Sequence, residues 1–125
     1  MKSRSFWASL HDAVCGVVYA LASQRNMKIH LIAALLVVAA GLFLGLNRVE
    51  WSVIILTVTA VWAAEIMNTS LEKVVDLLSP QYNVVAGRAK NISAGAVLVT
   101  ALGAVLVGIM IFGPRIIQWL EGFSR

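Results

Sequence analysis

Residues 29–47 read IHLIAALLVVAAGLFLGLN, a run without a charged side chain that is bounded by Lys28 and Arg48. As an α-helix this run would be about 28 Å long at 1.5 Å per residue, which is enough to cross a hydrocarbon layer of roughly 30 Å. Its apolar residues follow one another too densely for a helix with one solvated face. The run therefore predicts a first membrane span over residues 29–47.

Two further runs of the same kind follow it. Residues 51–70 contain Glu65 as their only charged residue, and residues 92–114 contain none. The whole chain of 125 residues is 60% hydrophobic and 13% charged, which is unlike a soluble globular domain. The sequence predicts an all-α membrane protein with three transmembrane helices in a single domain, residues 1–125.

The segment before the first span predicts one more helix, at about residues 5–24. Its apolar side chains recur at helical spacing, which favours an amphipathic helix on the cytoplasmic surface of the membrane. A helix packed against the bundle is the alternative, and the sequence does not separate the two. The segment that starts at Met1 lacks a continuous apolar core followed by a small-residue cleavage site, so we expect no cleaved signal peptide. The apolar positions are Trp7, Leu10, Val14, Val17, Val18 and Leu21.

The distribution of Lys and Arg predicts the orientation of the spans. Seven of the ten basic residues lie before the first span or between the second and third. Cytoplasmic flanks carry this excess, so the N-terminus is expected in the cytoplasm. The connection between the last two spans is expected at residues 79–87, which contain Pro80 and Gly87, with the preceding helix ending near Leu78.

A polar stripe interrupts the second span. Glu65, Asn68, Glu72 and Asp76 are three, four and four residues apart, so on a helix they share one face. Ionisable side chains at membrane depth are costly and indicate function. The alternative is the solvated face of a helix that emerges from the membrane, but Glu65 and Asn68 lie too deep for that interpretation.

The spacing along the stripe predicts different roles for Glu65 and Glu72. Glu65 and Glu72 are separated by roughly 10 Å of helix rise, too far to share one metal ion easily. Glu65 lies deeper and suits a general base acting on a lipid hydroxyl. Glu72 lies nearer the water and suits a Mg²⁺ ligand for a nucleotide, with phosphates completing the coordination. Lys90, just before the third span, is expected at the same depth as a phosphate contact.

Several other chemistries find no support. The chain has no glycine-rich phosphate loop of the G-x-x-x-x-G-K or G-x-G-x-x-G type. His11, Cys15 and His30 do not have the spacing of a transition-metal site. The net charge of +4 is explained by topology, and no nucleic-acid-binding signature is present.

Three motifs give the chain a family resemblance. The string AEIMNTSLEKVVD at Ala64–Asp76, followed by AGRAK at Ala86–Lys90 and SAGAVL at Ser93–Leu98, resembles the small bacterial membrane lipid kinases of the prokaryotic diacylglycerol kinase and undecaprenol kinase family. The string RNMKIH at Arg25–His30 is closer to the undecaprenol kinase branch. The resemblance implies a homotrimer of three-span protomers with a surface helix, active sites shared between protomers, and transfer of the ATP γ-phosphate to a lipid hydroxyl.

The resemblance also implies residue roles. Glu65 would be the catalytic base, Asn68 its orienting partner, Glu72 a Mg²⁺ ligand and Lys90 a phosphate contact. Further contacts with the nucleotide or its metal would come from the remaining positions of the family pattern, which are Asp76, Tyr82, Gln24 and Asn91, with Gln24 at a metal-ligating position.

Two of these positions depart from the family pattern, because Gln24 stands where Glu is usual and Asn91 where Asp is usual. Each amide keeps an oxygen ligand but brings no negative charge, so weaker binding of metal or ATP is expected. Asn83, where relatives often have His, is a third departure that bears on nucleotide contacts.

Together these features predict an ATP- and Mg²⁺-dependent lipid kinase of the bacterial cytoplasmic (inner) membrane. Undecaprenol is the favoured acceptor and diacylglycerol the alternative. A catalytically weak relative that binds nucleotide or lipid is a further alternative, because of Gln24 and Asn91. A purely structural bundle is disfavoured by the intact stripe from Glu65 to Asp76.

Overall fold

The chain folds into helices joined by short connections. A computed structural model describes residues 5–81 and 83–123. Within these residues it contains four helices and no strand: α1 (Phe6–Ser23), α2 (Arg25–Leu44), α3 (Arg48–Leu78) and α4 (Val84–Phe123). Each is long and apolar enough to cross a membrane. The all-α prediction is thereby confirmed, although α3 and α4 extend beyond the predicted spans over residues 51–70 and 92–114.

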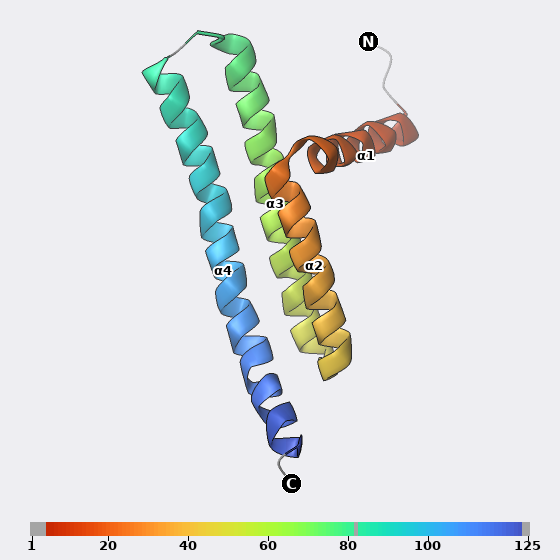
Figure 1. Cartoon of the computed structure of the whole chain (residues 1–125). Coiled ribbons are helices and arrows are strands. Elements are labelled where there is room, and N and C mark those ends of the chain that lie inside the picture. Colours follow the sequence, from red (N-terminus) through yellow and green to blue (C-terminus); the bar gives the residue numbers. More distant parts are fainter. Residues whose placement is uncertain (1–4, 82, 124–125) are drawn as a thin grey trace.

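Helices α2, α3 and α4 form a bundle, and α1 lies outside it. Helices α2, α3 and α4 run side by side, whereas α1 turns away and runs across their direction (Figure 1). The most extensive contact is between α3 and α4, and α2 packs mainly on α3. The turn between α1 and α2 is made at Gln24, whose backbone is extended at φ −101° and ψ 127°.

The connection between α2 and α3 is tightly specified. Gly45 ends α2 in the left-handed region at φ 67°, a conformation that glycine adopts without a steric penalty. Asn47 then begins α3 with a capping box. Its side chain accepts from the amides of Val49 and Glu50 at 2.9 and 3.0 Å, and the Glu50 carboxylate accepts from the Asn47 amide at 2.8 Å.

Arg115 ties α4 to this connection. Its guanidinium donates to both carboxylate oxygens of Glu50, at 2.6 and 3.3 Å, and to the carbonyls of Leu44 and Gly45, at 3.2 and 2.8 Å. The Gly45 and Leu44 carbonyls lie at the end of α2, where no helical partner remains for them. One side chain thus holds three helices together at the end opposite to the α3–α4 connection.

The α3–α4 connection is shorter than the sequence indicated. Helix α3 ends at Leu78 as predicted, but α4 begins at Val84, so the expected loop over residues 79–87 is wrong in its second half. The Asn83 side chain accepts from the amides of Val85 and Ala86 at 2.8 and 3.2 Å and starts the helix before Gly87.

Helix α4 also runs beyond Pro114, which was the predicted end of the third span, and continues to Phe123. A proline removes one backbone hydrogen bond from a helix, and apolar helices tolerate that loss when neighbouring groups compensate for it.

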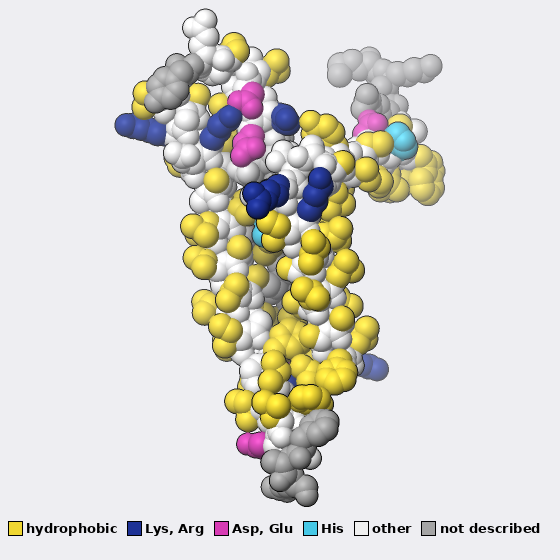
Figure 2. All heavy atoms as spheres, viewed as in Figure 1, with side chains coloured by type: hydrophobic (Ala, Val, Ile, Leu, Met, Phe, Trp, Pro, Cys, Tyr) yellow, Lys and Arg dark blue, Asp and Glu magenta, His cyan; other side chains and the backbone are white. Residues whose placement is uncertain are grey.

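Most of the apolar surface faces outward. Hydrophobic side chains cover the middle of the bundle, while Lys, Arg, Asp and Glu gather near the end that carries the α3–α4 connection (Figure 2). Large hydrophobic residues such as Leu35, Leu106 and Ile109 are more than half exposed. An exterior of this kind is typical of a chain surrounded by hydrocarbon or by other membrane helices. Among the described residues, the buried hydrophobic ones are Ala20, Met27, Leu46, Ile54, Val61 and Val97.

Candidate functional site

The polar stripe lies on one face of α3 and passes from the interior to the surface. Glu65 is 2% exposed and Asn68 is 6% exposed. Glu72, further along the same face, is partly buried, and the Asp76 side chain is 60% exposed. The stripe therefore has a buried end at Glu65, called the dry end, and a solvent-exposed end at Asp76, called the wet end. This is the order of depth that the sequence predicts.

Hydrogen bonds within the stripe connect its middle members. The Asn68 amide donates to the Glu72 carboxylate at 3.2 Å, while the Asn68 Oδ1 atom has no partner among the described residues. The Thr69 hydroxyl donates to the Glu65 carbonyl at 2.9 Å. Asn68 thus contacts the carboxylate that was predicted to hold metal, in addition to lying beside the predicted base.

Lys90 reaches the stripe from α4. Its ammonium contacts the Asp76 carboxylate at 2.5 Å, with the two side chains 35% and 60% exposed. An ion pair this exposed is weak, because water and salt screen it. A phosphate group can therefore compete with Asp76 for Lys90 at the wet end of the stripe.

A pocket of about 240 Å³ lies at the buried end of the stripe; four polar and five apolar side chains line it, and it is called the polar pocket for its four polar groups. Its polar side chains are Glu65 and Asn68 from α3 and Asn26 and His30 from α2. Asn26 and His30 therefore share this pocket with the Glu65 carboxylate. Glu65 Oε2 is buried and has no partner in the part of the chain that is described. The remaining lining residues are Ile29, Ala94, Val97, Leu98 and Ala101.

Sequence reasoning assigned no role to Asn26 and His30. They are one helical turn apart on α2, at the end of the first span that faces the stripe. Two polar residues one turn apart at the edge of an apolar run are the sequence signal that could have indicated a role for them in the site. The string Arg25–His30 served only as evidence of resemblance.

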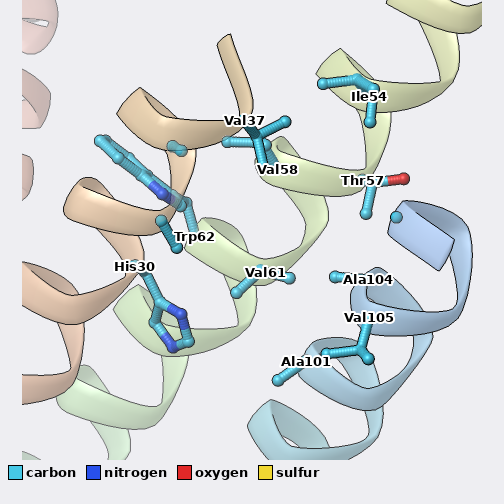
Figure 3. Close-up of a pocket in the computed structure, with 13 residues that line it drawn as sticks. His30, Val37, Ile54, Thr57, Val58, Val61, Trp62, Ala101, Ala104 and Val105 are labelled. Carbon is cyan, nitrogen blue, oxygen red and sulfur yellow. The ribbon is translucent and has the colours of Figure 1, made fainter. Parts of the chain in front are cut away.

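A second, apolar pocket of about 380 Å³ lies next to the polar one and shares His30 and Ala101 with it. Figure 3 shows side chains from α2, α3 and α4 converging on it, with Trp62 and His30 toward the α2 side. The indole N–H of Trp62 is buried and has no acceptor among the described residues. The two pockets together offer a polar end for a head group and an apolar continuation for a chain.

The other predicted site residues lie apart from these pockets. Gln24 occupies the junction of α1 and α2, and its side chain makes no capping hydrogen bond with α2. Asn91 is exposed next to Lys90. Neither residue lines the polar or the apolar pocket. Tyr82 lies outside the described residues. The structure therefore joins Glu65 with Asn68 and Asp76 with Lys90, but it does not bring Gln24 into either pocket.

The residues fit a magnesium ion held largely by a nucleotide. Within residues 5–81 and 83–123 no group of three or more His, Cys, Asp or Glu side chains could hold a metal ion by itself. Glu72 offers a carboxylate at the partly buried middle of the stripe. Mg²⁺ typically takes one or two carboxylates and completes its shell with phosphates and water, so a single Glu72 is a suitable protein ligand.

The fold and the site define a small helical membrane protein with a carboxylate and lysine site at one end of its bundle. The family model described as prokaryotic diacylglycerol kinase matches residues 11–112. The chain belongs to this family. It is 32% identical to the undecaprenol kinase of Bacillus subtilis over 111 residues, covering 89% of this chain and 90% of that protein.

Two diacylglycerol kinases are also similar to it. The chain is 41% identical to the diacylglycerol kinase of Synechocystis sp. over 111 residues, which cover 88% of this chain and 63% of that protein. It is 33% identical to the diacylglycerol kinase of Escherichia coli K12 over 75 residues, which cover 60% of this chain and 62% of that protein. The family's kinase activity toward lipids follows from these relatives, whereas their names point to two different acceptors.

Proposed function

We propose that this protein transfers the γ-phosphate of ATP, with Mg²⁺, to the hydroxyl of undecaprenol in the bacterial cytoplasmic membrane. One observation carries the proposal: the carboxylate of Glu65 is 2% exposed and has an unpartnered oxygen in a polar pocket that adjoins an apolar one. A buried carboxylate that lies between the solvent-exposed end of the stripe and the apolar pocket is suited to act as the base for a lipid alcohol.

In this reaction Glu65 accepts the proton of the lipid hydroxyl. The hydroxyl oxygen forms a bond to the γ-phosphorus as the bond from that phosphorus to the ADP oxygen breaks, so the products are lipid phosphate, ADP and a protonated Glu65. Phosphoryl transfer depends mainly on positioning and charge neutralisation, which a small helical scaffold with a few fixed charged groups can supply.

The outer part of the stripe holds the nucleotide. Lys90 exchanges its exposed partner Asp76 for a phosphate oxygen, and Glu72, oriented by the Asn68 amide, is the protein ligand for magnesium. A bound Mg²⁺ ion would neutralise charge on the transferring phosphates. Gln24, Asn91 and Tyr82 are the further proposed contacts with the nucleotide or its metal.

The same proposal includes the membrane arrangement. Helix α1 lies on the cytoplasmic surface, since it runs across the direction of the bundle and has the lowest mean hydropathy of the four candidate spans (Figure 1). Helices α2, α3 and α4 span the membrane with the N-terminus in the cytoplasm. Three protomers associate through the exposed apolar faces and share their active sites.

A second acceptor, diacylglycerol, is favoured by Trp62. Its buried indole N–H has no acceptor in the described chain and lies at the apolar pocket, three residues before Glu65. Three residues correspond to about 4.5 Å of helix rise. An ester carbonyl close to the hydroxyl of diacylglycerol would satisfy this donor, whereas the hydrocarbon tail of undecaprenol carries no oxygen.

A side-by-side transfer assay tests the proposal. Labelled ATP and Mg²⁺ are supplied with undecaprenol or with diacylglycerol in detergent micelles, and phosphate transfer to each lipid is measured. We expect transfer to undecaprenol to be the faster. Faster transfer to diacylglycerol would support the second acceptor, and transfer to neither lipid by correctly assembled protein would contradict the proposed function and leave a weak nucleotide- or lipid-binding relative.

A further inference from the structure

His30 occupies the junction of the two pockets. It is in the lining of both the polar pocket that contains Glu65 and the apolar pocket that contains Trp62. Figure 3 shows its ring extending from α2 into the space beside Val61. The residue is partly buried, so its ring lines the same pocket as the buried Glu65 carboxylate and is not sealed from that pocket.

The Glu65 carboxylate has few other groups to exchange a proton with. The other polar side chains that line its pocket are His30, Asn26 and Asn68. Asn26 and Asn68 do not titrate, and Glu72 is already bound by Asn68. His30 is therefore the titratable side chain of the polar pocket that is available to Glu65.

Among the described residues, the helices packed around α2 add no titratable side chain besides Glu65 to the lining of the polar pocket. The lining contributed by α4 is entirely apolar: Ala94, Val97, Leu98 and Ala101. Lys90 of α4 is paired with Asp76 at the wet end of the stripe. The titratable side chains of α1 do not line either pocket; they are His11, Asp12, Cys15 and Tyr19.

We infer that His30, which lines the same pocket as Glu65, accepts across that pocket, by way of water, the proton that Glu65 has taken from the lipid hydroxyl, and then releases it to solvent. This inference rests on the proposed function. After the phosphoryl group has moved to the lipid oxygen, Glu65 carries one extra proton in a dry site and has to lose it before the next turnover. A neutral imidazole nitrogen takes that proton, Glu65 returns to its carboxylate form, and His30 then loses the proton to solvent.

The inference predicts a pH dependence of defined sign. Imidazole changes its charge between about pH 5 and 8, and only its neutral form can accept a proton. The value of kcat should therefore rise with pH across this range in the wild-type protein. In His30→Gln the rise should disappear and kcat at pH 8 should fall about tenfold or more, since proton transfer by a positioned group contributes roughly 10²–10⁴-fold.

The experiment measures kcat for lipid phosphorylation from pH 5.5 to pH 9 in micelles for three proteins: wild type, His30→Gln and His11→Gln. His11 is the matched control, because it is the other histidine of the chain and its side chain is 76% exposed on α1. Loss of the rise in His30→Gln, with the rise retained in His11→Gln, supports the inference. The same rise in all three proteins would overturn it and assign the titration to another group.

A second variant covers the case in which His30→Gln does not assemble. His30→Ala opens space for free imidazole, which should restore kcat at least threefold, and it should not restore Glu65→Gln. Absence of rescue in assembled His30→Ala would count against the inference. Failure of the wild-type protein to phosphorylate any lipid is a different result, since it contradicts the proposed function itself.

Discussion

The substitution Asn68→Leu tests whether the Asn68 side chain orients the Glu72 carboxylate or the Glu65 carboxylate. The structure has the Asn68 amide donating to Glu72 at 3.2 Å, while its Oδ1 atom is unpartnered. A hydrogen bond to a charged group is worth about 1.5–3 kcal/mol, and 3.2 Å is at the long end of the usual range, so about 1.5 kcal/mol is the appropriate figure. This corresponds to roughly a tenfold change in an equilibrium constant. Because Glu72 is the proposed magnesium ligand, the Mg²⁺ concentration for half-maximal activity should rise about tenfold.

The assay titrates Mg²⁺ at saturating ATP and lipid in wild type, Asn68→Leu and Asn26→Ala. The Asn26 side chain lines the pocket that contains Glu65, and Glu72 does not line that pocket, so its removal should lower kcat without shifting the Mg²⁺ dependence. The reasoning would be refuted if Asn68→Leu left the Mg²⁺ midpoint unchanged and lowered only kcat. That outcome would make Asn68 a partner of Glu65 alone, as the family resemblance implies.

Three other predictions follow from the same geometry. Restoring the family's acids with Gln24→Glu and Asn91→Asp should lower the half-maximal Mg²⁺ concentration severalfold, because each adds a negative charge; an unchanged titration would show that the departures are neutral. Asp76→Asn should lower the KM for ATP about two- to fivefold by releasing Lys90 from an exposed pair, and a raised KM would mean that Asp76 itself supports the nucleotide. Arg115→Ala should lower the thermal midpoint in detergent by several degrees, because it removes four hydrogen bonds at the α2–α3 connection, whereas Arg48→Ala should have little effect.

Much of the fold could be predicted from the order of apolar runs and charges. The span over residues 29–47 needs a helix because no other structure satisfies its backbone in hydrocarbon, and α2 ends at Leu44, close to the end of that run. The stripe from Glu65 to Asp76 could be placed on one face because helical periodicity alone determines which residues share it. The graded burial along the stripe follows from the same argument.

The remaining features depend on contacts between distant residues. The start of α4 at Val84 depends on the Asn83 side chain, whose capping role the sequence pattern does not distinguish from a place in the loop over residues 79–87. The approach of Asn26 and His30 to Glu65 depends on how α2 packs against α3, and spacing within one helix does not contain that information. Similarly, the bond from Asn68 to Glu72 was open from the sequence, since Glu65 and Glu72 are both within one turn of Asn68.

The most direct test of the account is phosphate transfer by Glu65→Gln. The amide keeps the size of the buried side chain but cannot accept the hydroxyl proton as a carboxylate does. Transfer of labelled phosphate from ATP to undecaprenol and to diacylglycerol would be measured in micelles, with assembly of the variant verified by its elution volume and thermal midpoint. We expect assembled Glu65→Gln to lose at least 100-fold in kcat, in line with the contribution of a general base. Transfer at the wild-type rate by assembled Glu65→Gln would contradict the assignment of Glu65 as the base.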